Sequence, residues 1–251
     1  MRSELFALVA ALVGGACSAQ ISGSGGNQLA DIDAGGTGDP TGDATTTTMP
    51  PLCASRAVYL NFEGQTLTQG RSDATTNQAE WMQIATGTAP PYLSGNANRA
   101  TTIQGIVDGV RAQLAQFPIT VVTTRPATGN YVMIVYGGLR AAVGSNYGSA
   151  VNRLDCDDSR PNDVAWISDN VATVQHAVNL TLGAIGFGLG LTATNDPLDC
   201  MCGWANGCTS NNTVACTLGA AIDRDTAAVQ TCAGALKQQN EIATLHDAFC
   251  R

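Results

Sequence analysis

The sequence VATVQHAVNLTLGAIGFGLG, residues 171–190, carries the clearest structural signal in this chain. Its apolar side chains recur every three or four residues, which is the spacing of one face of an α-helix. Glycine is frequent in the second half, and each interior glycine costs a helix about 1 kcal/mol relative to alanine. We therefore expect tertiary packing to hold this helix together, or the helix to end early. The apolar positions are Val171, Val174, Val178, Leu182, Ile185 and Leu189, and the glycines are Gly183, Gly186, Gly188 and Gly190.

The sequence before this segment predicts four strands and a further helix. Runs of β-branched and aromatic residues bounded by turn residues indicate strands. Apolar residues at helical spacing indicate a helix that begins at a cap, Thr101 or Thr102, and stops at Pro118. The order strand, helix, strand, strand, strand predicts an α/β fold. The strands are expected at 58–62, 119–123, 131–136 and 163–168, and the helix has Ile103, Ile106, Val107, Val110, Leu114 and Phe117 as its apolar positions.

The composition of the 251 residues excludes several classes of protein. Hydrophobic residues make up 44% and charged residues 13%, which excludes a wholly disordered chain and a coiled coil. The formal net charge of -8 argues against nucleic acid as a partner, because a phosphate backbone would repel such a surface. Residues 53–251 are numerous enough for one domain with its own core.

The N-terminus, residues 1–17, predicts a bacterial export signal. Arg2 precedes an apolar run at 5–13 that is too short to span a bilayer, and small residues lead into Cys17. The sequence VGGAC, residues 13–17, resembles the lipobox, which implies a lipid on Cys17 that anchors the protein to a membrane of the cell envelope. The alternatives are a cleaved signal that leaves Cys17 unpaired and an extracellular location. Residues 18–52 are rich in Gly, Ser, Thr and Asp, and predict a disordered linker.

The nine cysteines also indicate an exported protein. Setting Cys17 aside leaves an even number, which predicts disulfide bonds with no thiol left over. The spacing of Cys200 and Cys202, followed by Cys208 and Cys216, is compatible with a zinc site, but disulfides are favoured in an exported chain. The spacing does not determine which cysteines pair. The expected disulfide cysteines are Cys53, Cys156, Cys200, Cys202, Cys208, Cys216, Cys232 and Cys250.

The segments 183–193 and 195–201 together resemble the catalytic helix and methionine turn of the metzincin zinc proteases. That family has the motif H-E-x-x-H-x-x-G-x-x-H, in which the histidines bind zinc and the glutamate is the general base. The resemblance implies a zincin-like fold over residues 53–251. That fold has a twisted mixed sheet, two main helices and a disulfide-rich C-terminal subdomain. Met201 would be the methionine of the turn, and residues 233–249 the closing helix, with Leu236, Ile242, Leu245 and Phe249 as apolar positions.

Only the glycine of the motif, at Gly190, is present in this chain. The three histidine positions fall on Gly183, Phe187 and Ala193, and the glutamate position falls on Ala184. None of these side chains can bind zinc or act as a base. The resemblance therefore implies a catalytically inactive metalloprotease homologue, a pseudoenzyme without zinc or another cofactor. We expect its cleft to bind an extended polypeptide by pairing with a sheet edge.

Two other functions stay open. An active metallopeptidase with unusual ligands would contain zinc, and the chain has two histidines, His176 and His246, to offer it. However, His176 lies seven residues from Gly183, which is about 10 Å along a helix, and a lone helical histidine is more often a surface residue than a ligand. The second alternative is a purely structural lipoprotein of the cell envelope.

An acidic cluster precedes the last predicted strand. Asp155, Asp157 and Asp158, with Asp163 nearby, are a weak candidate for a calcium-binding loop. They lack the spacing and the glycine of an EF-hand. We therefore expect a solvated acidic loop.

Overall fold

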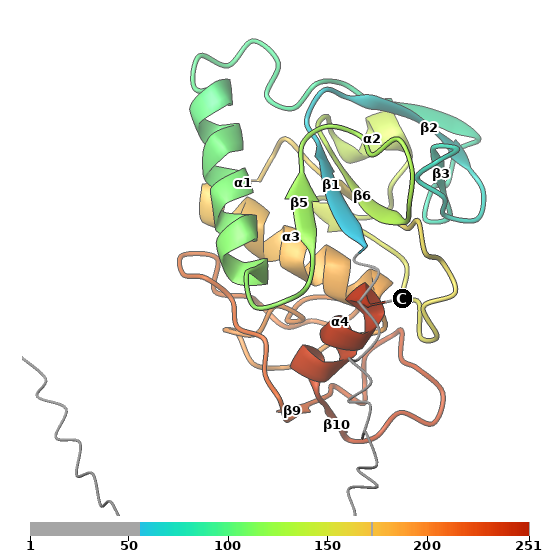
Figure 1. Ribbon diagram of the computed structural model, residues 1–251, viewed down its shortest axis with the longest axis vertical. Helices are drawn as coiled ribbons and strands as arrows, with labels where there is room; N and C mark the ends of the chain where they lie inside the picture. The colour runs from blue at the N-terminus through green and yellow to red at the C-terminus, as the bar shows by residue number, and fades with distance from the viewer. Residues whose placement is uncertain (1–55, 172, 251) are drawn as a thin grey trace, which may run out of the picture. The chain divides into compact units, whose positions relative to one another are not determined.

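The computed structural model describes residues 56–171 and 173–250, and these residues belong to one unit of the chain. The expectations for the export signal, for Cys17, for the linker at 18–52 and for Cys53 lie outside the described residues. Within them, the chain forms a mixed α/β structure with three sheets and four helices (Figure 1).

The central sheet contains β1 (Ala57–Asn61), β5 (Thr120–Val122), β6 (Tyr131–Tyr136), β7 (Ala150–Val151) and β8 (Val164–Ile167). Its strand order is β5-β1-β6-β8-β7, and all neighbours are parallel except β7, which runs antiparallel to β8. β6 lies in the middle, and all of its side chains are buried. The predicted strands are confirmed at β1, β5, β6 and β8, whereas no sequence pattern indicates the two-residue β7.

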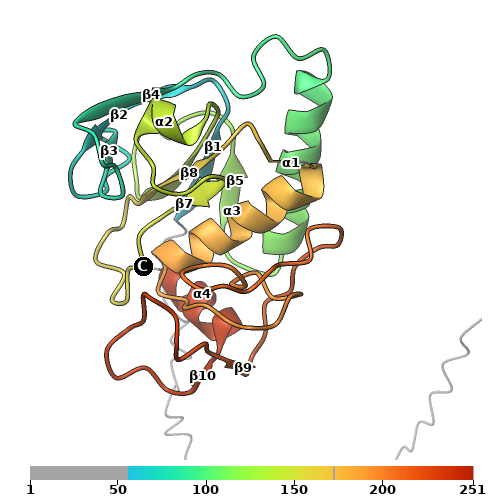
Figure 2. The same ribbon diagram turned by 180° about the vertical axis from the view of Figure 1, so that it is seen from behind.

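Two helices, α1 (Arg99–Leu114) and α3 (Val174–Gly188), cover one face of this sheet (Figures 1 and 2). Successive side chains of a strand point to opposite faces, so alternate strand residues pack against these helices. Both predicted helices are confirmed, although α1 begins before Thr101 and Thr102, so that the predicted cap is wrong. The shared core includes Leu60, Ile106, Val110, Ile134, Ile167, Val178 and Leu182.

A smaller sheet and a short helix pack on the opposite face. The sheet contains β2 (Gln65–Gln69), β3 (Gln78–Ala79) and β4 (Thr86–Ala89) in the order β3-β2-β4, and the helix is α2 (Arg140–Val143). Trp81, between β3 and β4, is buried against the central sheet, and its indole N–H donates a hydrogen bond of 2.8 Å to a carbonyl of β8. The sequence patterns did not indicate this layer.

The glycines of α3 are explained by groups that approach the helix closely. A Cβ atom on Gly183 would overlap the indole of Trp204, and one on Gly188 would overlap a buried carboxylate. On Gly186 it would lie 2.8 Å from the sulfur of Met201. Tertiary packing therefore holds this segment, and the helix runs to Gly188.

The chain after α3 is cross-linked by disulfide bonds and ends in a helix. A sheet of β9 (Ile222–Asp223) and β10 (Gln238–Gln239) precedes α4 (Glu241–Phe249), which is shorter than the expected 233–249. Leu236, an expected apolar position, is 78% exposed. No helix in the described part of the chain is long and apolar enough to cross a membrane. Disulfides join Cys156 to Cys232, Cys200 to Cys216 and Cys202 to Cys208, and Cys250 is disulfide-bonded as well.

Candidate functional site: a cleft beside strand β7

A cleft of about 270 Å³ lies between β7, α3 and the disulfide-bonded segment that follows Met201. Figure 2 shows β7 running beside α3, with the C-terminal segment on the other side of the helix. The sheet side of the cleft is formed by residues 147–152, and the opposite side by residues 202–205 with Ser210 and Gln230.

One face of α3 forms the floor of the cleft. His176, Leu180 and Phe187 line it, and Gly183 falls on the same helical face because these positions are three or four residues apart. The helix begins at a cap in which the side chain of Thr173 accepts a hydrogen bond of 3.1 Å from the N–H of His176. The metzincin resemblance assigns the first two histidine positions of its motif, Gly183 and Phe187, to this same face.

Trp204 fills the space that a side chain on Gly183 would enter. Its indole nitrogen would overlap a Cβ atom on residue 183, and its ring packs on Phe187 with 5.5 Å between ring centroids. Trp204 is 8% exposed and lies between Cys202 and Cys208, whose disulfide closes a short ring of residues. The two motif positions on α3 therefore face an indole.

The other motif positions are buried alongside. Ala184 and Ala193 are fully buried, and the carbonyl of Ala184 accepts a hydrogen bond of 2.9 Å from the side chain of Asn152. Met201 is also fully buried, and its sulfur packs against α3 at Gly186. Met201 is thus placed next to the helix that carries Gly183 and Phe187.

Gly190, the motif glycine, ends α3 in a Schellman motif. The N–H of Leu191 donates to the carbonyl of Gly186 at 2.9 Å, and the N–H of Gly190 donates to that of Phe187 at 3.3 Å. Gly190 has a φ of +92°, a backbone conformation that glycine adopts without steric cost. The glycine is therefore required where the chain leaves the helix.

Strand β7 is an edge of the central sheet at the cleft, and no other strand of the described residues pairs with its outer side. Ala150 pairs with Ile167, and the N–H of Ser168 donates to the carbonyl of Ser149 at 2.8 Å. Hydrogen-bonded positions alternate along an antiparallel pair, so the N–H and C=O of Ala150 point away from β8. Because Ala150 also lines the cleft, an extended chain lying there would meet these groups.

The cleft is uncharged. Among the described residues, no Asp, Glu, Lys or Arg side chain lines it, although the whole chain has a net charge of -8. Burial lowers the pKa of His176, which keeps its imidazole neutral at pH 7. The polar side chains that line the cleft are Ser149, Asn152, Ser210 and Gln230, with Tyr147 at 49% exposure.

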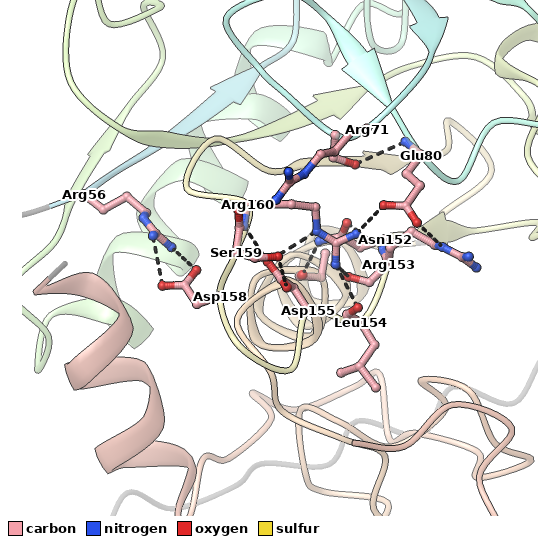
Figure 3. Close-up of polar contacts among 12 residues, drawn as sticks. Arg56, Arg71, Glu80, Asn152, Arg153, Leu154, Asp155, Asp158, Ser159 and Arg160 are labelled. Atoms are coloured by element: carbon pink, nitrogen blue, oxygen red, sulfur yellow. Dashed lines mark hydrogen bonds and ion pairs between the residues drawn. The ribbon is translucent and has the colours of Figure 1, made fainter. Parts of the chain in front are cut away.

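The acidic loop that follows β7 is anchored by arginines (Figure 3). Arg160 donates to Glu80 at 2.6 Å and pairs with Asp155 at 3.3 Å, while Arg56 forms two hydrogen bonds of 2.8 and 3.0 Å with Asp158. The expectation of a solvated loop is therefore wrong for Asp155, which is 4% exposed, and for Asp158. Asp157 is exposed, as expected. Ion pairs with arginine hold Asp155 and Asp158 in place.

Asp163 lies at the end of this loop and is fully buried beneath α3. Burial raises the pKa of its carboxyl group to about 6, and the positive charge of Arg160 opposes this shift. The same burial explains Gly188, because any side chain on that residue would overlap the Asp163 carboxylate. The expectation of a solvated loop is wrong for Asp163 as well.

Two buried carboxyl groups lie in contact, that of Asp199, two residues before Met201, and that of Glu241, the first residue of α4. Asp199 accepts hydrogen bonds from the N–H of Met201 at 2.7 Å and the hydroxyl of Thr194 at 3.0 Å. Glu241 accepts from the N–H of Gly219 at 2.9 Å and is fully buried. Burial, and then the charge of Asp199, raise the pKa of Glu241 to about 8. Burial raises the pKa of Asp199 too, so the two groups favour a state with one shared proton.

The two histidines occupy different places. His176 lines the cleft, whereas His246 lies on α4, where its side chain is 57% exposed and its ring nitrogen is 3.9 Å from Asp247. In the described part of the chain, no group of three or more His, Cys, Asp and Glu side chains is arranged to hold a metal ion.

Sequence patterns did not indicate several residues of the cleft. Trp204 is the most important of them, and Tyr147, Gln230 and the edge strand at Ala150 are others. One signal existed for Trp204, since it lies between Cys202 and Cys208 and a disulfide between them would hold an aromatic ring in place. A strand of two residues has no periodicity to detect.

No protein-family model matches the chain, and no curated protein matches it.

Proposed function

We propose that this protein is a metzincin-like pseudoprotease with a zincin-like fold. Support comes from the mixed sheet, the two main helices on one of its faces, and the disulfide-bonded C-terminal part that ends in a helix. Further support comes from α3, which carries the motif positions Gly183 and Phe187, lines the cleft with Phe187 and packs against Met201 at Gly186.

A catalytic zinc ion does not fit the residues at the motif positions. Gly183, Phe187 and Ala193 have no donor atom, and Ala184 cannot act as a general base. The indole of Trp204 occupies the space that a ligand side chain from residue 183 would need. No catalytic step is therefore assigned to this site.

The function that the cleft supports best is the binding of an extended polypeptide. The observation that carries this proposal is the free edge of β7, where the N–H and C=O of Ala150 face away from β8. An extended chain that lies along such an edge gains backbone hydrogen bonds whatever its sequence, and neighbouring pockets then select side chains. The cleft beside Ala150, with Phe187 and Trp204 in its lining, is such a pocket.

We also propose that the protein is exported and held at a bacterial cell envelope by a lipid on Cys17. The three disulfides among the described residues support export, because disulfides persist in oxidising compartments. Mass spectrometry of the membrane fraction tests the anchor, since the proposal requires diacylglycerol on Cys17 and its loss in Cys17→Ala.

The proposal for the cleft is tested by a variant that removes one outward-facing donor. Ala150→Pro deletes the N–H of residue 150 without breaking a β7–β8 hydrogen bond, and proline is accepted at such edge positions. Binding is measured with the full chain and a library of end-capped extended peptides. We expect Ala150→Pro to weaken binding about tenfold, because the complex loses one backbone hydrogen bond. Ala150→Ser keeps the N–H and is the matched control.

Two results would count against this function. Absence of binding by any extended peptide leaves the structural lipoprotein as the better description. Cleavage of the peptides by the purified protein, abolished by a chelator and restored by zinc, favours the metallopeptidase with unusual ligands.

A further inference from the structure

We propose that the cleft selects uncharged polypeptide segments. This inference rests on the proposed function, and it adds the chemical class of the ligand to it. The evidence for it is the absence of charged side chains from the cleft lining among the described residues.

The lining that the described residues form has no charged side chain, although 13% of the residues in the chain are charged. The chain carries 20 Asp and Glu and 12 Lys and Arg residues, yet none of them lines the cleft among the described residues. The one imidazole in the lining, that of His176, has a lowered pKa because it is half-buried. A ligand side chain with a charge would therefore lose water in the cleft and find no opposite charge there.

Two charged residues close to the lining already have polar partners. Arg153 follows the lining residue Asn152 in sequence, and its guanidinium lies 3.6 Å from the carboxylate of Glu80 (Figure 3). On the other side, Asn206 follows the lining residue Ala205 in sequence, and its side chain donates a hydrogen bond of 3.0 Å to Asp225. A ligand carboxylate or ammonium group would have to break such a contact to gain a partner.

The groups that do line the cleft suit an uncharged chain. Phe187 and Trp204 offer an apolar surface, while the side chains of Ser149 and Gln230 can exchange hydrogen bonds with neutral amides and hydroxyls. The N–H and C=O of Ala150 pair with peptide backbone, which is neutral. Each of these groups can be satisfied without a charge on the ligand.

The test uses three end-capped peptide libraries of equal length with the full chain. One library contains only uncharged residues, and the other two carry a single Asp or a single Lys at the central position. We expect the uncharged library to bind at least about tenfold more tightly than either charged library, because of the cost of burying an unpaired charge.

A charge placed in the cleft should change this ranking. In Gln230→Lys, the Asp library should gain affinity relative to the wild type and the Lys library should lose it. Gln104→Lys adds the same charge on an exposed part of α1 and should leave the ranking unchanged. These changes alter the ligand and partly exposed residues, so they do not depend on a buried substitution that could unfold the protein.

The outcomes separate this inference from the function on which it rests. Equal affinity for the three libraries would overturn charge selection and leave polypeptide binding in place. Absence of binding by all three would overturn both. Tighter binding of either charged library by the wild type would also overturn the inference.

Discussion

At the scale of single residues, Gly183 and Trp204 depend on each other, because a Cβ atom on Gly183 would overlap the indole. We expect Gly183→Ala to lower the free energy of unfolding by about 1–3 kcal/mol, since overpacking outweighs the gain of about 1 kcal/mol in helix propensity. Urea unfolding measures this change. Gly207→Ala is the control, because its Cβ atom would meet nothing within 4 Å and its effect should stay within about 0.5 kcal/mol. Full stability of Gly183→Ala would show that the indole does not occupy this space.

At the scale of elements, the disulfide between Cys202 and Cys208 closes the ring of residues that carries Trp204. Removing this disulfide should weaken peptide binding more than it lowers the stability of the fold. Cys202 and Cys208 are 6 residues apart, so replacing both by serine should cost about 2 kcal/mol of stability on the chain-entropy estimate. Cys156 and Cys232 are 76 apart, and the same replacement there should cost about 4–5 kcal/mol. Urea unfolding and peptide affinity, measured on both double variants, check this. If the Cys202/Cys208 variant binds peptide as the wild type does, the ring does not position Trp204 for binding.

The elements also show what the sequence can predict. The strands β1, β5, β6 and β8 and the helices α1 and α3 have clear periodicity, and they are found where the pattern indicates. Strand β7, the smaller sheet and the position of Trp204 depend on contacts between segments distant in sequence, so local patterns do not indicate them. The expectation of a solvated loop is wrong at Asp158 for the same reason, since its partner Arg56 is 102 residues away.

At the scale of the whole molecule, the stability should fall as the pH rises from about 4 to about 8. The pKa values of Asp163, about 6, and Glu241, about 8, are raised by burial, so the folded state binds more protons than the unfolded state over this range. This extra proton binding stabilises the folded state fully when the pH is below the pKa values of the unfolded chain. The stabilisation is lost as the pH rises through the pKa values of the folded state. Each pKa unit corresponds to about 1.4 kcal/mol, so the two shifts together set an upper limit of roughly 8 kcal/mol on the change.

Glu241→Gln should remove the upper part of this dependence. The amide cannot ionise, so the variant should melt at a higher temperature than the wild type near pH 8, while the two should be closer near pH 5. Asp247→Asn is the matched control, because it removes an exposed carboxylate from the same helix. Calorimetry at both pH values measures the effect. A wild-type melting temperature that rises steadily from pH 5 to pH 8 would contradict the account.

The central claim is that an extended polypeptide pairs with β7 at the cleft, and amide hydrogen exchange of the full chain tests it most directly. The rate of exchange at the N–H of Ala150 should be measured with and without a bound peptide from the uncharged library. We predict that binding slows exchange at Ala150, because that N–H gains a carbonyl partner. A peptide that binds tightly while exchange at Ala150 stays unchanged would contradict strand pairing at this edge.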